Sequence, residues 1–530
     1  QMIMAQQQQR AMGGQPMFIL SEDAERTRGE DAQSSNIQAG KAVAETVRTT
    51  LGPRGMDKML VSDSGDVVIT NDGATILEKM DIEHPAAQMI VEVASTQEEE
   101  VGDGTTTASV LAGQLLAQAE DLLDDDVHPT TIVEGYHAAS QLALDAIDDL
   151  VLDEELDDDL LQSVAASSMT GKGTGDINAG ALAETVVAAV RHAETGDGIA
   201  RNDIALRTQT GAGASATELV EGVITEEEPA HAAMPRSVEA ANVAVLDLDL
   251  DLQEANIDAE YNVTDVSQLE QALDAEEEEL AGYADTLVDA GVDVAFVTGD
   301  IADRVASVLG KEDVLAVESV SDDDASAIAR ATGSTTVGSL QDLESADLGH
   351  ADSIHVESYG GDDLTFVEGG ENAETVTLFV RGGTEHVADE LERALNDALD
   401  VVIAALTEGG VVPGAGATEI AIADAVRSGA TSVEGRKQLA VEAFADAVDV
   451  LPRTLAENTG LDPIDALVDL RNRHDSEGVA GLISEGQSGN VGDPVEAGIL
   501  DPAAVKREAV ESATEAATMI ARIDDVISSS

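Results

Sequence analysis

Residues 101–111 read VGDGTTTASVL, with two glycines and an aspartate directly before three threonines and an alanine-rich apolar pattern. Leu111, Leu115 and Leu122 recur at helical spacing, so the threonines are predicted to begin a helix. The first N–H groups of a helix are unpaired and carry a partial positive charge, and glycine lets a ligand approach the backbone closely. The stretch therefore predicts a phosphate site that needs no lysine.

Asp103 lies inside this loop and would repel a phosphate unless a cation lay between the two charges. Mg²⁺ binds proteins through one or two carboxylates together with phosphate oxygens, so Asp103 is the candidate magnesium ligand. Aspartate and threonine are also ordinary capping residues before a helix. The motif by itself leaves nucleotide binding and simple helix capping equally open.

The composition predicts a folded protein of several domains. The chain has 530 residues, which corresponds to about three domains of roughly 150 residues each. Hydrophobic residues make up 43% and aromatic residues 2%, with no tryptophan, so alanine, valine, leucine and isoleucine must fill the cores. Cysteine is absent from the sequence, which excludes disulfides, thiolate zinc sites and cysteine nucleophiles.

The charge predicts a protein that depends on salt. Asp and Glu number 106 against 27 Lys and Arg, and the formal net charge is −79. Nucleic acids and anionic membranes carry the same sign, so neither is an expected partner. Self-repulsion destabilises the folded state, and salt screens it over a Debye length of about 3 Å at 1 M. We therefore expect a halophilic protein whose melting temperature rises as KCl approaches molar concentration. A melting temperature that falls over that range would contradict this expectation.

The sequence contains no apolar run of 18 residues and no signal-peptide pattern at its start. Residues 1–17 are polar and are expected to form a flexible tail. A cytoplasmic protein is therefore expected.

Helical patterns dominate both ends of the chain, and strands gather in the middle. Strands are predicted at 67–70, 243–253, 292–301 and 375–383, and helices at 36–51, 84–101, 105–126, 129–150, 263–291 and 385–406. Residues 410–525 are again mostly helical in pattern. The fold class is therefore α/β and multidomain, with an α/β segment near 230–375 between helical ends.

Four further segments have ordinary structural readings when each is taken alone. TTLGPRGMDK (49–58) is typical of a helix end, and TNDGAT (70–75) of a tight turn. TGKG (170–173) lacks the spacing of a Walker A loop, and Asp397 belongs to a helix rich in acids, where a solvated carboxylate is expected. The sequence contains no HExxH or GxSxG motif.

Taken together, several segments resemble group II chaperonins, and archaeal thermosome subunits in particular. These segments are, in order, TTLGPRGMDKML, TNDGATIL, GDGTTTASVLAG, SMTGKG, RGGTEHVADELERALNDALDVV, GGVVPGAGATEI, NTGLDPIDALVDLR and GILDP. The similarity extends from about residue 18 to residue 527, which is nearly the whole chain.

The resemblance implies three domains. A mostly helical, split equatorial domain (18–158 and 409–530) would bind ATP, and a small intermediate domain (159–227 and 376–408) would transmit motion. An α/β apical domain (228–375) would bind non-native protein, and its helical protrusion (about 255–285) would serve as a built-in lid. Two stacked rings of identical or related subunits are the assembly that the family implies.

The resemblance also implies an Mg²⁺-dependent ATP site. Near the phosphates, the matching residues are Leu51, Gly52, Pro53, Asp72, Gly73, Gly104, Thr105, Thr106 and Thr107, with Asp103 as the Mg²⁺ ligand. Asp72 would position the attacking water, and Asp397 would be the catalytic base. Gly414 and Gly416 match residues that flank a loop near the nucleoside, Asp501 matches an acid that contacts the ribose, and Lys172 matches a lysine in a nucleotide-sensing loop.

The implied function is an ATP-dependent chaperone that encloses unfolded protein in a chamber closed by ATP hydrolysis. Asp397 would reach the nucleotide only when the intermediate domain closes, which would couple hydrolysis to closure. A ring that only holds clients, or a structural assembly without a folding cycle, is the alternative. The sequence ends in IDDVISSS and not in the Gly/Met-rich tail of many family members.

Overall fold

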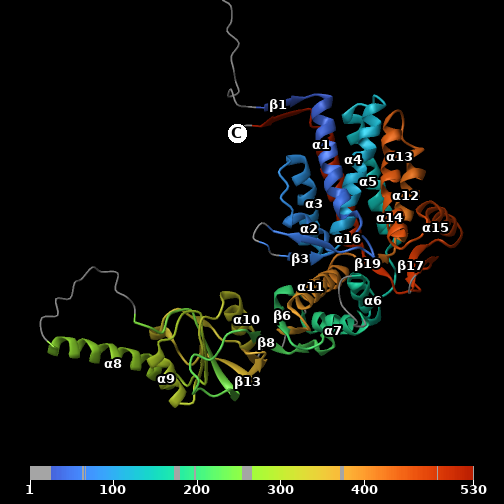
Figure 1. Cartoon of the computed structure of the whole chain (residues 1–530). Coiled ribbons are helices and arrows are strands. Elements are labelled where there is room, and N and C mark those ends of the chain that lie inside the picture. Colours follow the sequence, from blue (N-terminus) through green and yellow to red (C-terminus); the bar gives the residue numbers. More distant parts are fainter. Residues whose placement is uncertain are drawn as a thin grey trace, which may run out of the picture.

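A computed structural model describes residues 25–62, 65, 67–171, 179–195, 198–252, 266–370, 375–485 and 488–528. Within these residues, buried hydrophobic side chains form three large cores. Figure 1 shows them in series, with a helical body at one end and a sheet carrying a projecting helix at the other. In the described part of the chain, no helix combines the length and the apolar character that crossing a bilayer would require.

The first core is built by helices from both ends of the chain. These are α1 (Glu30–Arg48), α3 (Pro85–Val101), α4 (Thr105–Asp124), α5 (Pro129–Leu150), α12 (Ala417–Ala430), α13 (Lys437–Val448), α14 (Val450–Asn458) and α16 (Ala503–Ala521). Small residues allow them to pack closely, since a Cβ added to Gly135 of α5 would lie 2.4 Å from the Cβ of Ala440 on α13. Alanine and glycine contacts thus join N-terminal and C-terminal segments in one body.

Short strand pairs and two further helices surround this body. The helices are α2 (Gly73–Lys79) and α15 (Pro463–Glu477). The antiparallel strand pairs are β1 (Glu25–Arg28) with β20 (Asp525–Ser528), β2 (Lys58–Val61) with β3 (Val67–Thr70), β16 (Val411–Pro413) with β19 (Leu500–Pro502), and β17 (Gly481–Glu485) with β18 (Ser488–Gly492). The β16–β19 pair brings the loop before α12 next to the start of α16.

The second core lies between the helical body and the large sheet. Its helices are α6 (Asp158–Met169), α7 (Ala179–His192) and α11 (Glu385–Thr407). Its strands are β6 (Ile204–Thr210), β7 (Glu218–Val220) and β15 (Val376–Gly382), with β4 (Glu194–Thr195) and β5 (Gly198–Ile199) forming a small hairpin nearby. β15 runs parallel to β6 and antiparallel to β7, so this core also joins two separate stretches of chain.

The third core belongs to a mixed sheet in the order β11-β10-β9-β13-β14-β8, with β12 also pairing with β9. The strands are β8 (Gly222–Thr225), β9 (Ser237–Leu246), β10 (Val294–Val297), β11 (Leu315–Val317), β12 (Thr336–Val337), β13 (Gly349–Tyr359) and β14 (Asp362–Gly370). Helices α8 (Val266–Ala290), α9 (Asp303–Lys311) and α10 (Asp322–Thr332) accompany them. α8 extends away from the rest of the molecule in Figure 1.

The predicted helices at 84–101, 105–126, 129–150 and 385–406 are confirmed as α3, α4, α5 and α11. The helix predicted at 36–51 begins earlier and ends earlier, as α1 covers Glu30–Arg48. Of the predicted protrusion at about 255–285, residues 255–265 lie outside the described residues, and α8 begins at Val266.

The strand predicted at 243–253 is wrong in its bounds, because β9 covers Ser237–Leu246. The acidic residues that follow β9 are engaged by a neighbouring turn. Thr298 Oγ1 donates to Asp247 Oδ1 over 2.9 Å, and the Asp300 N–H donates to Asp249 Oδ1 over 3.1 Å. The alternating Asp and Leu residues after Leu246 therefore form a loop that hydrogen-bonds to the turn at 298–300, although the same alternation is typical of a strand.

Candidate functional site

One cavity collects most of the residues that the sequence predicts for nucleotide binding. It encloses about 760 Å³, a volume typical of ligand pockets. The predicted residues in its wall are Leu51, Gly52, Pro53, Asp72, Gly73, Asp103, Gly104, Thr105, Thr106, Thr107, Gly416 and Asp501. Gly414 and Asp397 are not in the wall, and Lys172 lies outside the described residues.

Two long helices begin at the cavity without a capping side chain. Gly104 is the N-cap of α4 with a φ of 84°, and Gly416 is the N-cap of α12 with a φ of 81°, and neither helix has a side-chain cap. Positive φ favours glycine at both positions. First-turn N–H groups and the helix dipole attract anions, so the two helix ends are suited to phosphate or another anionic group.

Asp72 has a structural role at the cavity in addition to any chemical one. It is the N-cap of α2, and its Oδ2 accepts a hydrogen bond from the Thr75 N–H over 2.7 Å. Its Oδ1 lies 3.5 Å from Thr105 Oγ1, at the start of α4. A Cβ on Gly73 would lie 2.5 Å from Thr106 Oγ1, so the turn and the threonines pack tightly together. TNDGAT is therefore the capped start of a helix and not an isolated tight turn, and Oδ1 of Asp72 lies next to a threonine of the cavity wall.

Asp103 does not cap α4, since the N-cap is Gly104. Asp103 Oδ1 accepts from the Gly104 N–H over 2.8 Å, and its main-chain oxygen accepts from Gln97 Nε2 over 2.7 Å. These bonds hold the loop while the residue remains in the cavity wall. The simple capping reading of Asp103 is therefore wrong.

The charges in the wall bear on whether a cation fits. The ionisable residues that line the cavity are Arg54, Asp72, Asp103, Glu419, Asp501 and Lys506. Acidic residues thus outnumber basic ones two to one, so a polyphosphate there needs a metal ion to offset the repulsion. A carboxylate at Asp103, next to the uncapped helix end of α4, is the kind of partial ligand set that Mg²⁺ completes with phosphate oxygens.

The loop 51–54 closes one side of the cavity. Gly52 has a φ of 85°, and a Cβ there would lie 2.4 Å from Leu455 Cδ2. Asn458 Nδ2 donates to the Leu51 carbonyl oxygen over 2.9 Å, which ties the loop to α14. Asn71 Nδ2 donates to the Gly171 carbonyl oxygen over 2.6 Å, so the start of the glycine-rich loop after α6 also reaches the cavity. The helix-end reading of this segment is incomplete, because the turn also forms part of the wall.

Sequence reasoning missed three charged residues of the wall, Arg54, Glu419 and Lys506. Lys506 Nζ lies 2.8 Å from Glu419 Oε1 and 2.8 Å from Asp501 Oδ2. Burial raises the pKa of Asp501, and Lys506 opposes that rise. Burial alone would lower the pKa of Lys506, but Asp501 and Glu419 outweigh it and the pKa is raised, so the lysine is charged. The sequence offered one indication of Lys506, since lysine is rare in this chain, with only seven in 530 residues.

Asp397 is buried on α11, with 7% of its surface exposed, so the reading of it as a solvated surface carboxylate is wrong. The helix contacts the Asp103 loop at Asp400, one turn further along. A Cβ on Gly102 would lie 2.3 Å from the Cβ of Asp400, and residues three apart on a helix are neighbours. α11 therefore packs directly beside the loop that carries Asp103.

Gly414 lies directly behind Asp501. A Cβ on Gly414 would lie 3.2 Å from Asp501 Oδ2 and 3.1 Å from the Ile499 carbonyl oxygen. The Gly414 N–H donates to that same carbonyl oxygen over 2.9 Å. Gly414 thus supports the wall at Asp501 without forming part of it.

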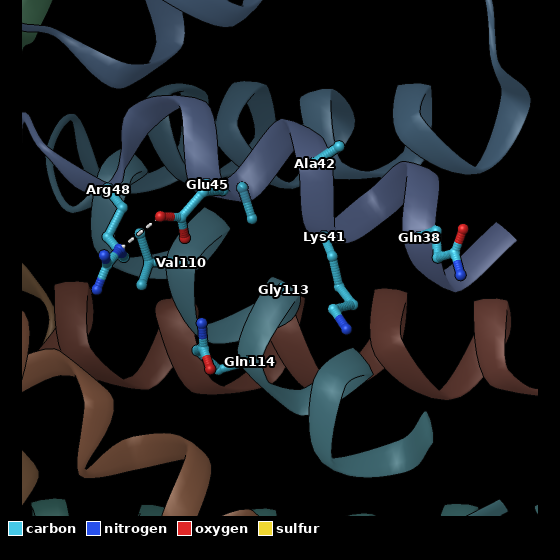
Figure 2. A pocket seen from close by; sticks show the side chains of 9 residues that line it. Gln38, Lys41, Ala42, Glu45, Arg48, Val110, Gly113 and Gln114 are labelled. Carbon is cyan, nitrogen blue, oxygen red and sulfur yellow. Dashed lines mark hydrogen bonds and ion pairs between the residues drawn. The ribbon is translucent and has the colours of Figure 1, made fainter. Parts of the chain in front are cut away.

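A second hollow of about 310 Å³ lies between α1 and α4. Figure 2 shows Lys41, Glu45 and Arg48 along α1 at this hollow, with an ion pair between Glu45 and Arg48. None of the residues predicted for nucleotide binding lines it. The larger cavity is therefore the candidate functional site.

Comparison with known proteins gives a consistent result over the whole chain. The model of the TCP-1/cpn60 chaperonin family matches residues 43–530. Thermosome subunit 3 of Haloferax volcanii is 67% identical over 515 residues, which cover 97% of this chain and 98% of the relative. Thermosome subunit alpha of Halobacterium salinarum is 53% identical over 526 residues, covering 99% and 92%. The thermosome subunit of Methanopyrus kandleri is 49% identical over 520 residues, covering 97% and 95%.

Proposed function

The chain belongs to the TCP-1/cpn60 chaperonin family, and from this premise we propose that it is a subunit of a ring-forming, ATP-dependent chaperone. The observation that carries the proposal is the cavity in which two uncapped helix N-termini, the loop 51–54 and the carboxylates of Asp72 and Asp103 meet. Phosphoryl transfer needs positioning and charge neutralisation more than covalent chemistry, and this cavity supplies positioning groups. The acidic composition of the chain, and its sequence identity to relatives from Haloferax and Halobacterium, indicate a salt-adapted organism.

In this proposal, the phosphates of ATP lie at the start of α4, against Gly104, Thr105, Thr106 and Thr107. Asp103 would hold the Mg²⁺ that neutralises phosphate charge during hydrolysis. Asp72 would orient the attacking water through Oδ1, because Oδ2 is engaged in capping α2. Asp501 on β19 and Gly416 at the start of α12 would contact the nucleoside.

Asp397 is the proposed base for the water. It is buried on α11 and outside the cavity wall, so α11 must move before the carboxylate reaches the nucleotide. Because α11 packs in the second core with β6 and β15, its movement would carry that core along. Hydrolysis would then be coupled to a change in the position of the neighbouring sheet.

We assign the three cores to three domains. The first core supports an equatorial domain (18–158 and 409–530), and the second supports an intermediate domain (159–227 and 376–408). The sheet core supports an apical domain (228–375) that would bind non-native protein, with α8 in a built-in lid. The projection of α8 away from the sheet favours this last assignment.

An exposed apolar hairpin supports assembly with like subunits. Strands β2 and β3 expose Met59 by 66%, Val61 by 64%, Val67 by 39% and Ile69 by 46%. Exposed apolar patches of this kind mark interaction surfaces. We propose that a neighbouring subunit, identical or paralogous, covers this hairpin in the ring.

The test is refolding of a chemically denatured client by the purified assembly at molar KCl with Mg²⁺. We expect ATP, but not a non-hydrolysable analogue, to raise the yield of active client. Aggregation suppressed equally with and without ATP would contradict the folding cycle and favour the alternative, a ring that only holds clients. The intact carboxylates Asp72, Asp103 and Asp397 favour hydrolysis over that alternative.

A variant of the hairpin serves as the assembly control. Ile69→Asp should lower the particle mass from a multi-subunit ring to small species and abolish ATP-stimulated refolding, because a charge replaces an apolar contact. Ile69→Val keeps the apolar surface and should keep the ring. Full-size rings of Ile69→Asp would contradict the role of the hairpin.

A further inference from the structure

A buried lysine in the cavity wall has no role in the proposal above. Lys506 lies in the first turn of α16, and its side chain is 11% exposed. Its Nζ lies 2.8 Å from Glu419 Oε1 on α12 and 2.8 Å from Asp501 Oδ2 on β19. The lysine therefore joins three elements that meet at one side of the cavity.

The cluster of Lys506, Glu419 and Asp501 is not expected to stabilise the folded protein. Removing charged groups from water costs free energy that a buried ion pair recovers only in part. The cluster contains two carboxylates for one lysine, and Glu419 Oε2 is buried without a hydrogen-bond partner among the described residues. Glu419 is 5% exposed, so water does not compensate. Charged groups retained under these conditions in a cavity wall point to a functional role.

All three members of the cluster line the cavity, and Asp501 is the most exposed of them. Its side chain is 27% exposed, against 11% for Lys506 and 6% for Glu419. The bond to Lys506 uses Oδ2, and a carboxylate has acceptor capacity left on its other oxygen. Gly414 packs behind the carboxylate, since a Cβ at this position would lie 3.2 Å from Asp501 Oδ2, a tight contact.

Charge and position are therefore both controlled at Asp501. Burial, Glu419 and Asp103 all raise the pKa of Asp501, and Lys506 is the group that lowers it. Lys506 thus opposes the rise in the pKa of Asp501 and favours the ionised carboxylate, which acts only as an acceptor. The hydroxyl groups of a sugar are donors that match such an acceptor.

We propose that Lys506, anchored on Glu419, is a positioning residue that holds Asp501 to accept hydrogen bonds from the sugar hydroxyls of the bound nucleotide. This inference rests on the proposed function, in which the cavity binds ATP. The resemblance already implies that Asp501 contacts the ribose, and the inference adds that Lys506 acts on nucleotide binding only through Asp501.

The experiment compares ATP with 2′,3′-dideoxy-ATP by titration calorimetry on the assembled protein at molar KCl with Mg²⁺. A hydrogen bond to a charged group corresponds to about a tenfold preference for ATP in the wild type. Lys506→Met should weaken ATP binding by about the same tenfold factor and leave dideoxy-ATP within about twofold, so the preference disappears. Asp424→Asn, an exposed acid on the same helix as Glu419, should keep the preference.

A merely structural role for Lys506 would weaken both ligands equally, and that result would overturn the proposal. Unaltered ATP binding in Lys506→Met would also overturn it. If Lys506→Met does not fold, the double variant Glu419→Leu/Lys506→Met removes both buried charges and gives the same comparison. A wild type that binds both nucleotides equally would overturn this inference alone, whereas a wild type that binds neither would overturn the proposed function as well.

Discussion

Asp397→Asn should lower the turnover number for ATP by roughly 10²- to 10⁴-fold, the contribution expected of a positioned general base. The dissociation constant for ATP should stay within about twofold of the wild-type value, because a base outside the wall contributes to the chemical step and not to ground-state binding. Asp397 is 7% exposed on α11 and does not line the cavity. Binding and hydrolysis should therefore separate in this variant.

The measurement pairs calorimetric ATP binding with single-turnover hydrolysis on the assembled protein. Glu385→Gln is the matched control, since Glu385 is an exposed acid in the first turn of the same helix. The control should hydrolyse ATP at the wild-type rate. Wild-type turnover in Asp397→Asn would show that Asp397 is not the base, and loss of ATP binding would show that its role is structural.

Asp103→Asn should abolish Mg²⁺-stimulated turnover, with a loss of about 10³-fold or more, because charge neutralisation is a main contribution to phosphoryl transfer. The asparagine Oδ1 can still accept the hydrogen bond that Asp103 Oδ1 accepts from the Gly104 N–H. The loop should therefore keep its shape while the negative charge is lost. This separation makes the substitution a test of metal binding and not of folding.

The loss should be read from turnover and nucleotide affinity as functions of Mg²⁺ concentration, with EDTA as the zero point. Wild type should respond steeply to Mg²⁺, and Asp103→Asn should be nearly flat. Asp124→Asn, at the exposed end of α4 remote in sequence from the loop, should behave as wild type. A normal Mg²⁺ response in Asp103→Asn would show that Asp103 is not the metal ligand and that another carboxylate of the wall binds Mg²⁺.

Much of the candidate site could be predicted because its parts are local motifs. Gly104 and Thr105 are adjacent in sequence, and the uncapped start of α4 follows from glycine before a run of threonines. The same reasoning left Asp103 open between capping and metal binding. The structure removes the capping reading of Asp103, since Gly104 is the N-cap of α4, whereas Asp72, expected in a tight turn, is the residue that caps α2.

Other residues were out of reach of sequence patterns. Glu419 and Lys506 lie on α12 and α16, and their ion pair exists only because the β16–β19 pair brings the starts of those helices together. Asp397 was expected to be solvated because its neighbours in sequence are acidic. Its burial depends on how α11 packs in the second core, and the helix pattern does not specify that packing partner.

Local sequence was sufficient for the kinds of elements, for the loops suited to phosphate and for the acidic surface. Helix periodicity, turn preferences and charge depend on residues within a few positions of each other, or on composition alone. The order of the sheet, the union of the two chain ends in one core and the Glu419–Lys506–Asp501 cluster depended on three-dimensional packing. Contacts between distant segments form only where buried surfaces of matching shape meet, and one sequence without its fold does not specify which surfaces those are.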